Sequence, residues 1–429
     1  MALHNRILIG LIGGAAFGVS VNVMLGLTPG VEWMLRNVTE PLGRVWLNSL
    51  IMVVIPLVLS TLALGITGLG DVSRLGRIGL MTLLSFLALT AAATVLGLVL
   101  VNTIRPGGRM DPAMRESLMT TYSGSSQMSG LSPGALSINT FVNFVPRNPV
   151  KAMAEGEMLA VIIFALFIGV ALTTIPREKA TPMLSLLESL AAVTIRIIEI
   201  VMRFAPYAVF FLIFSVTARF GLGLLATLAT YVVTVVGGLA LFLVVGYSAA
   251  LALVARRHPI DFFRKARIVM VTAFSTSSSN ATLPTTLRVT EEDLHVPREV
   301  AGFVIPLGAT ANMNGTALFE GVTVLFIAQV FGQDLTLSQQ AIVVLMSVVT
   351  AIGTAGVPGG SIPLLMMVLQ MVRVPVEGIA IIIGVDRILD MCRTTVNVTG
   401  DMVTATIVDR FERARLPQAA ASSPLREKA

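Results

Sequence analysis

The chain has 429 residues, of which 55% are hydrophobic and only 13% are charged. Soluble domains carry about 25% charged residues, so this composition excludes an ordinary soluble enzyme and indicates a polytopic membrane protein. The formal net charge of +6 does not imply a nucleic-acid partner, because the basic residues of membrane proteins gather in cytoplasmic loops. Cys392 is the only cysteine, so neither an intrachain disulfide nor a cysteine-based metal site can form.

Apolar windows long enough to cross a bilayer recur along the first 255 residues. We expect spans at 6–27, 45–67, 77–104, 157–175, 188–216 and 224–255. The first window lacks a small-residue cleavage pattern and is expected to be a span rather than a removed signal. The basic gaps 68–77, 175–182 and 255–267 fall on one side of the membrane if the N-terminus is cytoplasmic. Both termini are therefore expected inside, and the polar stretch 105–134 outside.

Two later segments are apolar at their flanks and interrupted in the middle. Segment 268–290 has a Ser/Thr/Asn core, and segment 340–373 contains GTAGVPGGSIP. The halves are too short to span, which is the length signature of a re-entrant helical hairpin. Span 298–330 lies between them and contains GATANMNGTALFEG, which predicts either a kinked helix or an unwound stretch whose carbonyl oxygens suit Na⁺. Paired interruptions of this kind are typical of a transporter built from inverted repeats.

The last apolar stretch, at 385–401, carries a row of polar side chains. They are Asp386, Asp390, Arg393, Asn397 and Asp401. Their spacing of three or four residues places them on one face of a helix. An ionisable residue at mid-membrane depth costs about 2.5–3.5 kcal/mol and normally faces a cavity or a partner. The alternative, an Asp390–Arg393 pair buried for packing alone, leaves the residues that follow unexplained.

The residues of this row suit two kinds of ligand. Arg393 can hold a carboxylate through two parallel hydrogen bonds, and Asp390, one turn away, can hold an ammonium group. Thr394 and Asn397 add neutral donors, so the set fits an acidic amino acid, aspartate or glutamate. Asn397 also offers an amide oxygen that, with the carboxylate of Asp401, can bind a cation.

Four motifs in this order resemble the glutamate transporter family, the dicarboxylate/amino acid:cation symporters. They are SSSNATLP (277–284), NMNGTALFE (312–320), GTAGVPGG (353–360) and DMCRTTVNVTGD (390–401), within a resemblance that covers about residues 5–411. The resemblance is to prokaryotic-type members. It implies an all-α polytopic membrane protein of the cell (inner) membrane, with eight transmembrane helices and two re-entrant hairpins, assembled as a homotrimer.

The resemblance also implies two domains and an elevator-type motion of one against the other. The expected scaffold comprises 1–76 and 135–220, with spans one, two, four and five. The expected transport domain comprises 77–134, which includes the extracellular loop, and 221–413. Within the latter we expect a hairpin at 260–293, a span at 298–330, a hairpin at 336–373 and the last span at 376–411. Residues 414–429 are expected to be a disordered cytoplasmic tail.

The resemblance implies roles for individual residues, including those of the polar row. The expected substrate contacts are Ser278, Ser279, Thr316, the backbone at Val357, Asp390, Arg393, Thr394 and Asn397. One expected Na⁺ site consists of Gly308, Asn312, Asn397 and Asp401. A second consists of Thr310, Met313, Ile352 and Thr354. Asp386 is left outside these sets and is expected to be structural.

The departures from the family pattern concern ion coupling. The family's third sodium site has Asp where this chain has Asn314, and Tyr and Thr where it has Phe86 and Leu89. Only Thr90 keeps a hydroxyl, so we expect this third cation site to be lost. Glu320 matches a proton-carrying position. We therefore expect symport coupled to fewer sodium ions, with a proton on Glu320 as a further coupling ion.

A symporter of acidic amino acids has three alternatives. Neutral amino acids or C4-dicarboxylates are alternatives on the same fold, but the presence of both Asp390 and Arg393 favours an acidic amino acid. A serine hydrolase built on Ser277–Ser279 would need a base, and the three histidines lie near span ends or in loops. An ion channel would not require an Asp–Arg pair. The chain is thus expected to be no enzyme, with the bilayer, its substrate and copies of itself as partners.

Overall fold

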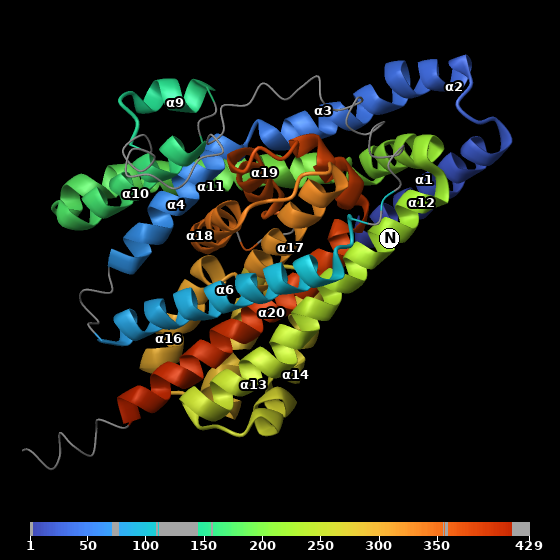
Figure 1. Cartoon of the computed structure of the whole chain (residues 1–429). Coiled ribbons are helices and arrows are strands. Elements are labelled where there is room, and N and C mark those ends of the chain that lie inside the picture. The colour runs from blue at the N-terminus through green and yellow to red at the C-terminus, as the bar shows by residue number, and fades with distance from the viewer. Residues whose placement is uncertain are drawn as a thin grey trace, which may run out of the picture.

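A computed structural model of the chain describes residues 3–70, 77–108, 110, 145–155, 158–354, 356 and 359–413 (Figure 1). Within these ranges the regular secondary structure consists of helices alone. Most of the polar stretch 105–134, Val357 and the tail 414–429 lie outside the described residues.

The elements are, in chain order, α1 (Leu3–Met24), α2 (Pro29–Met34), η1 (Leu35–Thr39), α3 (Glu40–Ile51), α4 (Val54–Gly70), α6 (Arg77–Ile104), α9 (Pro149–Glu155), α10 (Met158–Thr174), α11 (Arg177–Met202), α12 (Ala205–Leu241), η3 (Phe242–Gly246), α13 (Tyr247–Ala249), η4 (Ala250–Ala255), α14 (Pro259–Thr276), α15 (Ser279–Arg288), η5 (Val289–Asp293), α16 (Arg298–Ala311), α17 (Asn314–Val330), α18 (Leu337–Gly353), α19 (Ile362–Met371), η6 (Val376–Gly378) and α20 (Ile379–Arg413).

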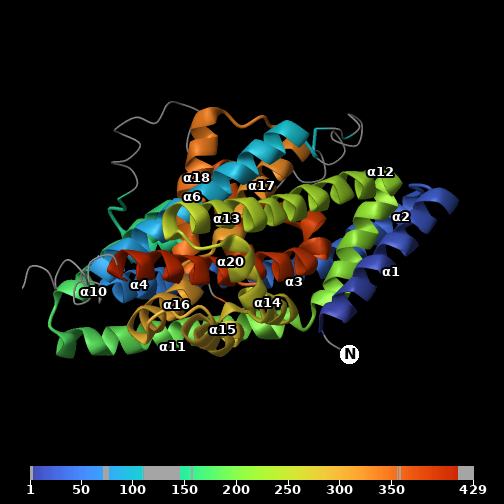
Figure 2. The same ribbon diagram turned by 90° about the horizontal axis from the view of Figure 1, so that it is seen from below.

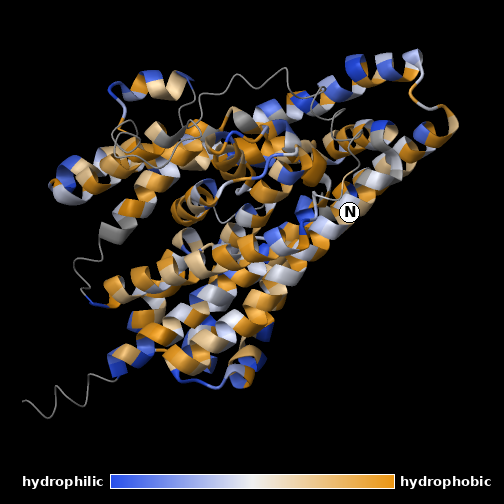
Figure 3. Cartoon of the chain, in the orientation of Figure 1, coloured by the Kyte–Doolittle hydropathy of each residue, from blue (hydrophilic) through white to orange (hydrophobic). Residues whose placement is uncertain are grey.

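Several helices are long and apolar enough to cross a membrane. In the described part these are Pro29–Thr67, Arg77–Ile104, Leu225–Ala255 and Arg298–Val330, and the pair Arg177–Met202 with Ala205–Arg219, bent by 58°, makes a fifth if it is one span. Apolar residues run along most helices, and polar residues gather at their ends (Figure 3). The prediction of an all-helical membrane protein is thus confirmed, whereas the count of eight spans and two hairpins stays a prediction.

Helix α20 lies at the centre of the fold. It contacts α1, α6, α12, α14, α16 and α17, and Figure 2 shows it between α6 and α12 on one side and α14 to α16 on the other. Most residues from Ile379 to Asp409 are buried as a result. The polar row of α20 therefore faces other helices of the protein rather than lipid.

Three breaks between helices fall where the sequence predicts interruptions. α14 ends at Ser277, whose φ of 49° is left-handed, and Ser278 then caps α15 by accepting a hydrogen bond from the N–H of Ala281. α16 and α17 are separated by Asn312 and Met313, both with non-helical backbone angles. α18 and α19 are separated by residues 354–361.

The long helix α12 consists of two halves that meet at Gly221, where φ is 61°. The first half packs closely on α1. A Cβ at Gly14 would lie 2.6 Å from the carbonyl oxygen of Phe210, and a Cβ at Gly18 would lie 2.7 Å from that of Phe214. Glycines four residues apart on α1 thus let the two backbones touch, as in small-xxx-small packing of membrane helices.

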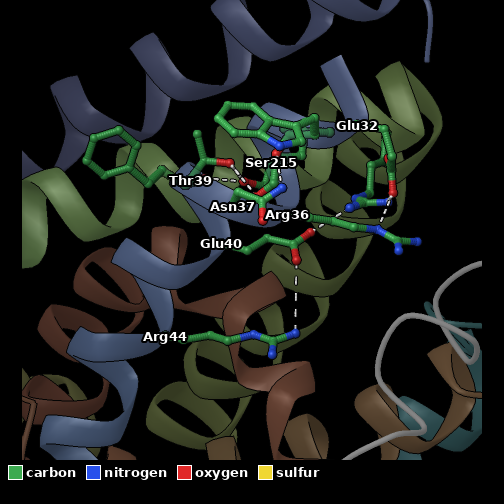
Figure 4. A network of polar contacts seen from close by, with 11 residues as sticks. Glu32, Arg36, Asn37, Thr39, Glu40, Arg44 and Ser215 are labelled. Atoms are coloured by element: carbon green, nitrogen blue, oxygen red, sulfur yellow. Dashed lines mark hydrogen bonds and ion pairs between the residues drawn. The ribbon is translucent and has the colours of Figure 1, made fainter. Parts of the chain in front are cut away.

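Arg219 fixes the end of this first half. Its guanidinium lies 2.9 Å from Glu32 and 2.8 Å from Glu40, and only 8% of its side chain is exposed. Figure 4 shows both carboxylates within a wider polar network that also contains a 2.6 Å contact between the hydroxyls of Thr39 and Ser215. The first half of α12 is therefore tied to α2, η1 and α3.

Candidate functional site

The centre of the site is Arg393 in α20, whose side chain is 1% exposed. Its Nη2 lies 2.9 Å from Oδ1 of Asp390, and its Nη1 lies 3.0 Å from Oδ1 of Asp386. The guanidinium carbon lies 3.9 Å from the centre of the Phe319 ring, which favours a cation over its face. The Asp390–Arg393 pair weighed as an alternative is thus formed, and Asp386 joins it.

Asp390 connects this cluster to the chain that follows α18. Its Oδ2 accepts a 3.3 Å hydrogen bond from the N–H of Gly359 and lies 3.5 Å from Nη1 of Arg387. The Thr394 hydroxyl donates to the carbonyl oxygen of Asp390. The carboxylate of Asp390, the expected partner of an ammonium group, therefore already has three donors around it, from Gly359, Arg387 and Arg393.

The two interrupted segments meet at Gly356. Its carbonyl oxygen accepts a 2.7 Å hydrogen bond from Oγ of Ser278 and a 3.3 Å bond from the N–H of Asn280. Ser279 is buried and lies close to Gly356: a Cβ at Gly356 would lie 3.2 Å from the Cβ of Ser279. The serine-rich break thus lies against the glycine-rich one, while the expected contact at Val357 lies outside the described residues.

Asn397 joins α20 to the start of α17. Its Oδ1 accepts hydrogen bonds from the N–H groups of Gly315, at 2.7 Å, and Thr316, at 3.3 Å. Its Nδ2 contacts Oγ1 of Thr316 and the sulfur of Met313, both at 3.2 Å. Four of the expected substrate residues, Asp390, Arg393, Thr394 and Asn397, therefore lie along one buried stretch of α20, with Thr316 beside the last of them.

Three residues of the first expected cation site, Gly308, Asn312 and Asp401, lie against one another, while Oδ1 of Asn397 accepts from the N–H groups of Gly315 and Thr316. Oδ1 of Asp401 accepts a 2.8 Å hydrogen bond from Nδ2 of Asn312, and Gly308 lies directly against the carboxylate. No arginine or lysine of the described chain pairs with Asp401, and Oδ1 of Asn312 is buried without a partner. A buried carboxylate and an unused amide oxygen fit a hard cation such as Na⁺, which oxygen ligands bind.

The second expected cation site is brought together only in part. Met313 and Ala351 pack in one small cluster, which places the unwound stretch beside the end of α18. Thr354 is buried, and its hydroxyl donates to the carbonyl of Thr350. Thr310 is exposed and its hydroxyl bonds to its own helix, and the carbonyl of Ile352 would lie 3.0 Å from a Cβ at Gly65 in α4.

Glu320 is fully buried between α17 and α18. Its Oε2 accepts a 2.8 Å hydrogen bond from Oγ1 of Thr350. Its Oε1 and the Oγ of Ser347 lie near each other, and neither makes a well-aligned hydrogen bond within the described chain. One carboxylate oxygen of Glu320 is therefore free to hold a proton.

The residues of the expected lost cation site form a neutral hydrogen-bonded chain. Thr90 donates to Oδ1 of Asn314 at 2.8 Å, and Nδ2 of Asn314 donates to Tyr247 at 3.0 Å. Phe86 is buried in the apolar core, and Leu89 packs against the same core. No charged group belongs to this cluster.

Three participants were given no role from the sequence: Phe319, Gly356 and Tyr247. Phe319 lies inside NMNGTALFE, where its place next to a polar motif could have indicated a contact with Arg393. Tyr247 carries no such signal, because it lies far from every motif in the sequence.

A match to the model of the sodium:dicarboxylate symporter family extends over residues 3–411. The chain belongs to this family. It is 35% identical to the proton/glutamate-aspartate symporter of Escherichia coli (strain K12) over 387 residues, which cover 89% of this chain and 87% of the relative. It is also 35% identical to the proton/sodium-glutamate symport protein of Bacillus subtilis (strain 168), covering 93% of each chain.

A third relative is named for a different substrate. The C4-dicarboxylate transport protein of Rhodospirillum rubrum is 32% identical over 387 residues, which cover 88% of this chain and 83% of the relative. The predicted resemblance to a symporter family is confirmed, and membership makes the chain a membrane transporter rather than an enzyme.

Proposed function

We propose that the chain is a secondary active symporter that takes up acidic amino acids, aspartate or glutamate, coupled to Na⁺ and H⁺. The observation that carries this proposal is the burial of Arg393 and the set of groups that its guanidinium contacts. Its guanidinium is almost fully buried, Nη2 and Nη1 lie against Asp390 and Asp386, and Nε has no hydrogen-bond partner among the described residues. A buried guanidinium with an unused donor, already surrounded by carboxylates, is suited to the carboxylate of a substrate.

The neighbours of Arg393 supply the rest of the recognition. Asp390 offers a carboxylate for an ammonium group, and Asn397 and Thr316 offer neutral polar groups one to two turns further along the buried face. Thr394, Ser278 and Ser279 at the hairpin tip, and the backbone at Val357 complete the proposed substrate set. Relatives named for glutamate and aspartate symport support an amino acid that carries a second carboxylate.

For the ions, we propose Na⁺ at Gly308, Asn312, Asn397 and Asp401, and a second Na⁺ at Thr310, Met313, Ile352 and Thr354. A proton is proposed on Glu320, whose Oε1 lacks a partner among the described residues. The names of the Bacillus relatives, proton/sodium-glutamate symport proteins, support both ions. The neutral chain at Thr90 and Asn314 supports a coupling ratio below three Na⁺ per substrate.

The motion that we propose is an elevator movement of a transport domain against a trimeric scaffold, in the cell inner membrane with both termini cytoplasmic. The two halves of α12 support it. The half before Gly221 is tied to α1, η1 and α3, while the half after it contacts α17 through the buried Tyr231 hydroxyl, 2.8 Å from Thr323. This division agrees with the proposed boundary between 220 and 221.

A C4-dicarboxylate symporter is the second candidate, because relatives with that name share 32% identity with the chain. Such a substrate has no ammonium group for Asp390. Inhibition of aspartate uptake by succinate, with both at the same concentration, therefore separates the two candidates.

The test is uptake of radiolabelled aspartate by the full chain in proteoliposomes, with Na⁺ and pH gradients imposed separately. We expect accumulation to require inward Na⁺, to rise with external acidity and to be blocked by glutamate more than by succinate. Uptake of succinate without aspartate would establish the second candidate instead. Glu320→Gln is expected to keep Na⁺-driven uptake and lose the response to acidity. A ratio of three Na⁺ per substrate from reversal potentials would contradict the lost third site.

A further inference from the structure

Tyr247 is the first residue of the three-residue helix α13, which lies between the two π-helical segments η3 and η4. Its side chain is fully buried, and its ring meets Phe242 edge to face at 5.0 Å. π-helical turns are rare and are frequent at functional sites. Here two of them flank the one residue of this helix whose side chain reaches across to α17 and α20.

The hydroxyl of Tyr247 is part of an uninterrupted hydrogen-bonded chain. Thr90 in α6 donates to Asn314, which donates to Tyr247, which donates at 2.8 Å to the carbonyl oxygen of Val396 in α20. The Tyr247 oxygen uses its proton and accepts one hydrogen bond, so its donor capacity is filled. The chain thus ties together four helical elements and carries no charge.

This chain lies directly behind the first candidate cation site. A Cβ at Gly400 would lie 2.5 Å from the Tyr247 hydroxyl, 2.6 Å from Nδ2 of Asn314 and 3.2 Å from Nδ2 of Asn312. Because Gly400 has no side chain, the Tyr247 hydroxyl and the Asn314 amide can lie directly against the backbone of α20. On its other side, the same Nδ2 of Asn312 donates to Asp401.

Two members of this hydrogen-bonded chain, Val396 and Asn314, are adjacent in sequence to a pair of residues that contact each other. Val396 precedes Asn397, and Asn314 precedes Gly315, whose N–H donates to Oδ1 of Asn397 at 2.7 Å. Tyr247 bonds to Val396 and to Asn314, so it holds the backbone on both sides of this contact. Groups that orient metal ligands in this way typically change affinity by about 10–100-fold when they are lost.

We propose that Tyr247 is a positioning residue that sets the Na⁺ affinity of the site at Asn312, Asn397 and Asp401 without touching the ion. The inference rests on the proposed Na⁺ coupling and names a residue outside the proposed ligand sets. A residue that serves packing alone would change stability and leave Na⁺ affinity where it is.

The test is Tyr247→Phe in the full chain, which removes one oxygen and keeps the ring. The first measurement is aspartate uptake as a function of Na⁺, and the second is Na⁺ binding to the purified protein by calorimetry without aspartate. We expect half-saturating Na⁺ to rise about tenfold or more in both. The maximal rate at saturating Na⁺ is expected to stay within about twofold of the wild type, because the ligands themselves are intact.

Tyr231→Phe is the matched control. Tyr231 is equally buried, and its hydroxyl lies 2.8 Å from Thr323, away from the cation cluster. We expect its half-saturating Na⁺ to match the wild type. Thr90→Val removes the hydrogen bond from Thr90 to Asn314, at the far end of the hydrogen-bonded chain. We expect half-saturating Na⁺ to rise, but by less than in Tyr247→Phe.

Each outcome decides between distinct claims. A wild type whose uptake ignores Na⁺ contradicts the proposed function, and the inference with it. A Na⁺-driven wild type overturns the inference alone if Tyr247→Phe keeps the wild-type Na⁺ dependence, or if both tyrosine variants shift it equally. Should Tyr247→Phe fail to fold, an unchanged Na⁺ dependence in Thr90→Val overturns the inference.

Discussion

Nη2 of Arg393 lies 2.9 Å from Oδ1 of Asp390, one turn earlier on α20. The two charges assigned to substrate recognition thus also neutralise one another, and Asp386 adds a second carboxylate at 3.0 Å. Removing one partner of a buried pair costs about 3–5 kcal/mol, because the remaining charge is left uncompensated. A change to this cluster therefore affects the stability of the protein as well as its binding of substrate.

Arg393→Ala is expected to weaken aspartate binding by about 100-fold or more, because the carboxylate loses its only buried cationic partner in the proposed set. Arg393→Lys keeps the charge without the planar fork, so it is expected to fold normally and still lose most of the affinity. Calorimetric titration with aspartate measures both. Arg264→Ala is the control, since Arg264 is exposed in α14 and pairs only with Asp261 on its own helix. Wild-type aspartate affinity in Arg393→Ala would refute the assigned role.

Asp401→Asn is expected to raise half-saturating Na⁺ by about tenfold or more, since the only carboxylate of the proposed first site is lost. Asp409→Asn is the matched control on the same helix. Asp409 is as buried, but Arg413 at 2.7 Å and Arg257 at 3.4 Å neutralise it. Its loss should lower the melting temperature and leave the Na⁺ dependence unchanged. Equal Na⁺ shifts in the two variants would argue against a cation at Asp401.

The sequence predicted the local features of this site well. Helical periodicity brought Asp390, Arg393 and Asn397 to one stretch of α20, and the Ser, Asn and Gly clusters marked the breaks beside it. Both signals depend on residues close together in the chain: side chains three or four apart share a helix face, and runs of polar or glycine residues interrupt an apolar helix.

Contacts between distant segments could not be predicted in the same way. The bond from Ser278 to Gly356 joins residues 78 positions apart, and that from Tyr247 to Val396 joins residues 149 apart. No periodicity links such pairs. The π-helical turns that present Tyr247 have no sequence signature either, so the neutral chain behind the cation site became visible only in the fold.

Ser278→Ala is expected to loosen the contact between the two interrupted segments. The hydroxyl of Ser278 both caps α15 and donates to the carbonyl of Gly356, so its loss removes two hydrogen bonds. N-cap substitution alone costs about 1 kcal/mol. We expect faster dissociation of aspartate, measured by stopped-flow after dilution, with a modest fall in melting temperature. Ser275→Ala is the control, because its exposed hydroxyl bonds only within α14. Dissociation at the wild-type rate would show that the hydroxyl has no part in closing the site.

Arg219→Ala is expected to destabilise the protein strongly. Arg219 is the buried partner of Glu32 and Glu40. Without it both carboxylates, labelled in Figure 4, remain close together beside the end of the first half of α12. The expected loss is about 3–5 kcal/mol of unfolding free energy. Arg36→Ala removes an exposed partner of the same Glu32, at 2.6 Å and 70% exposure, and should cost only about 0–1 kcal/mol. Thermal melts in detergent compare the two. If Arg219 mainly ties the first half of α12 to α3, the Arg219→Ala variant will melt well below Arg36→Ala; equal melting temperatures would show that burial of this ion pair contributes no stability.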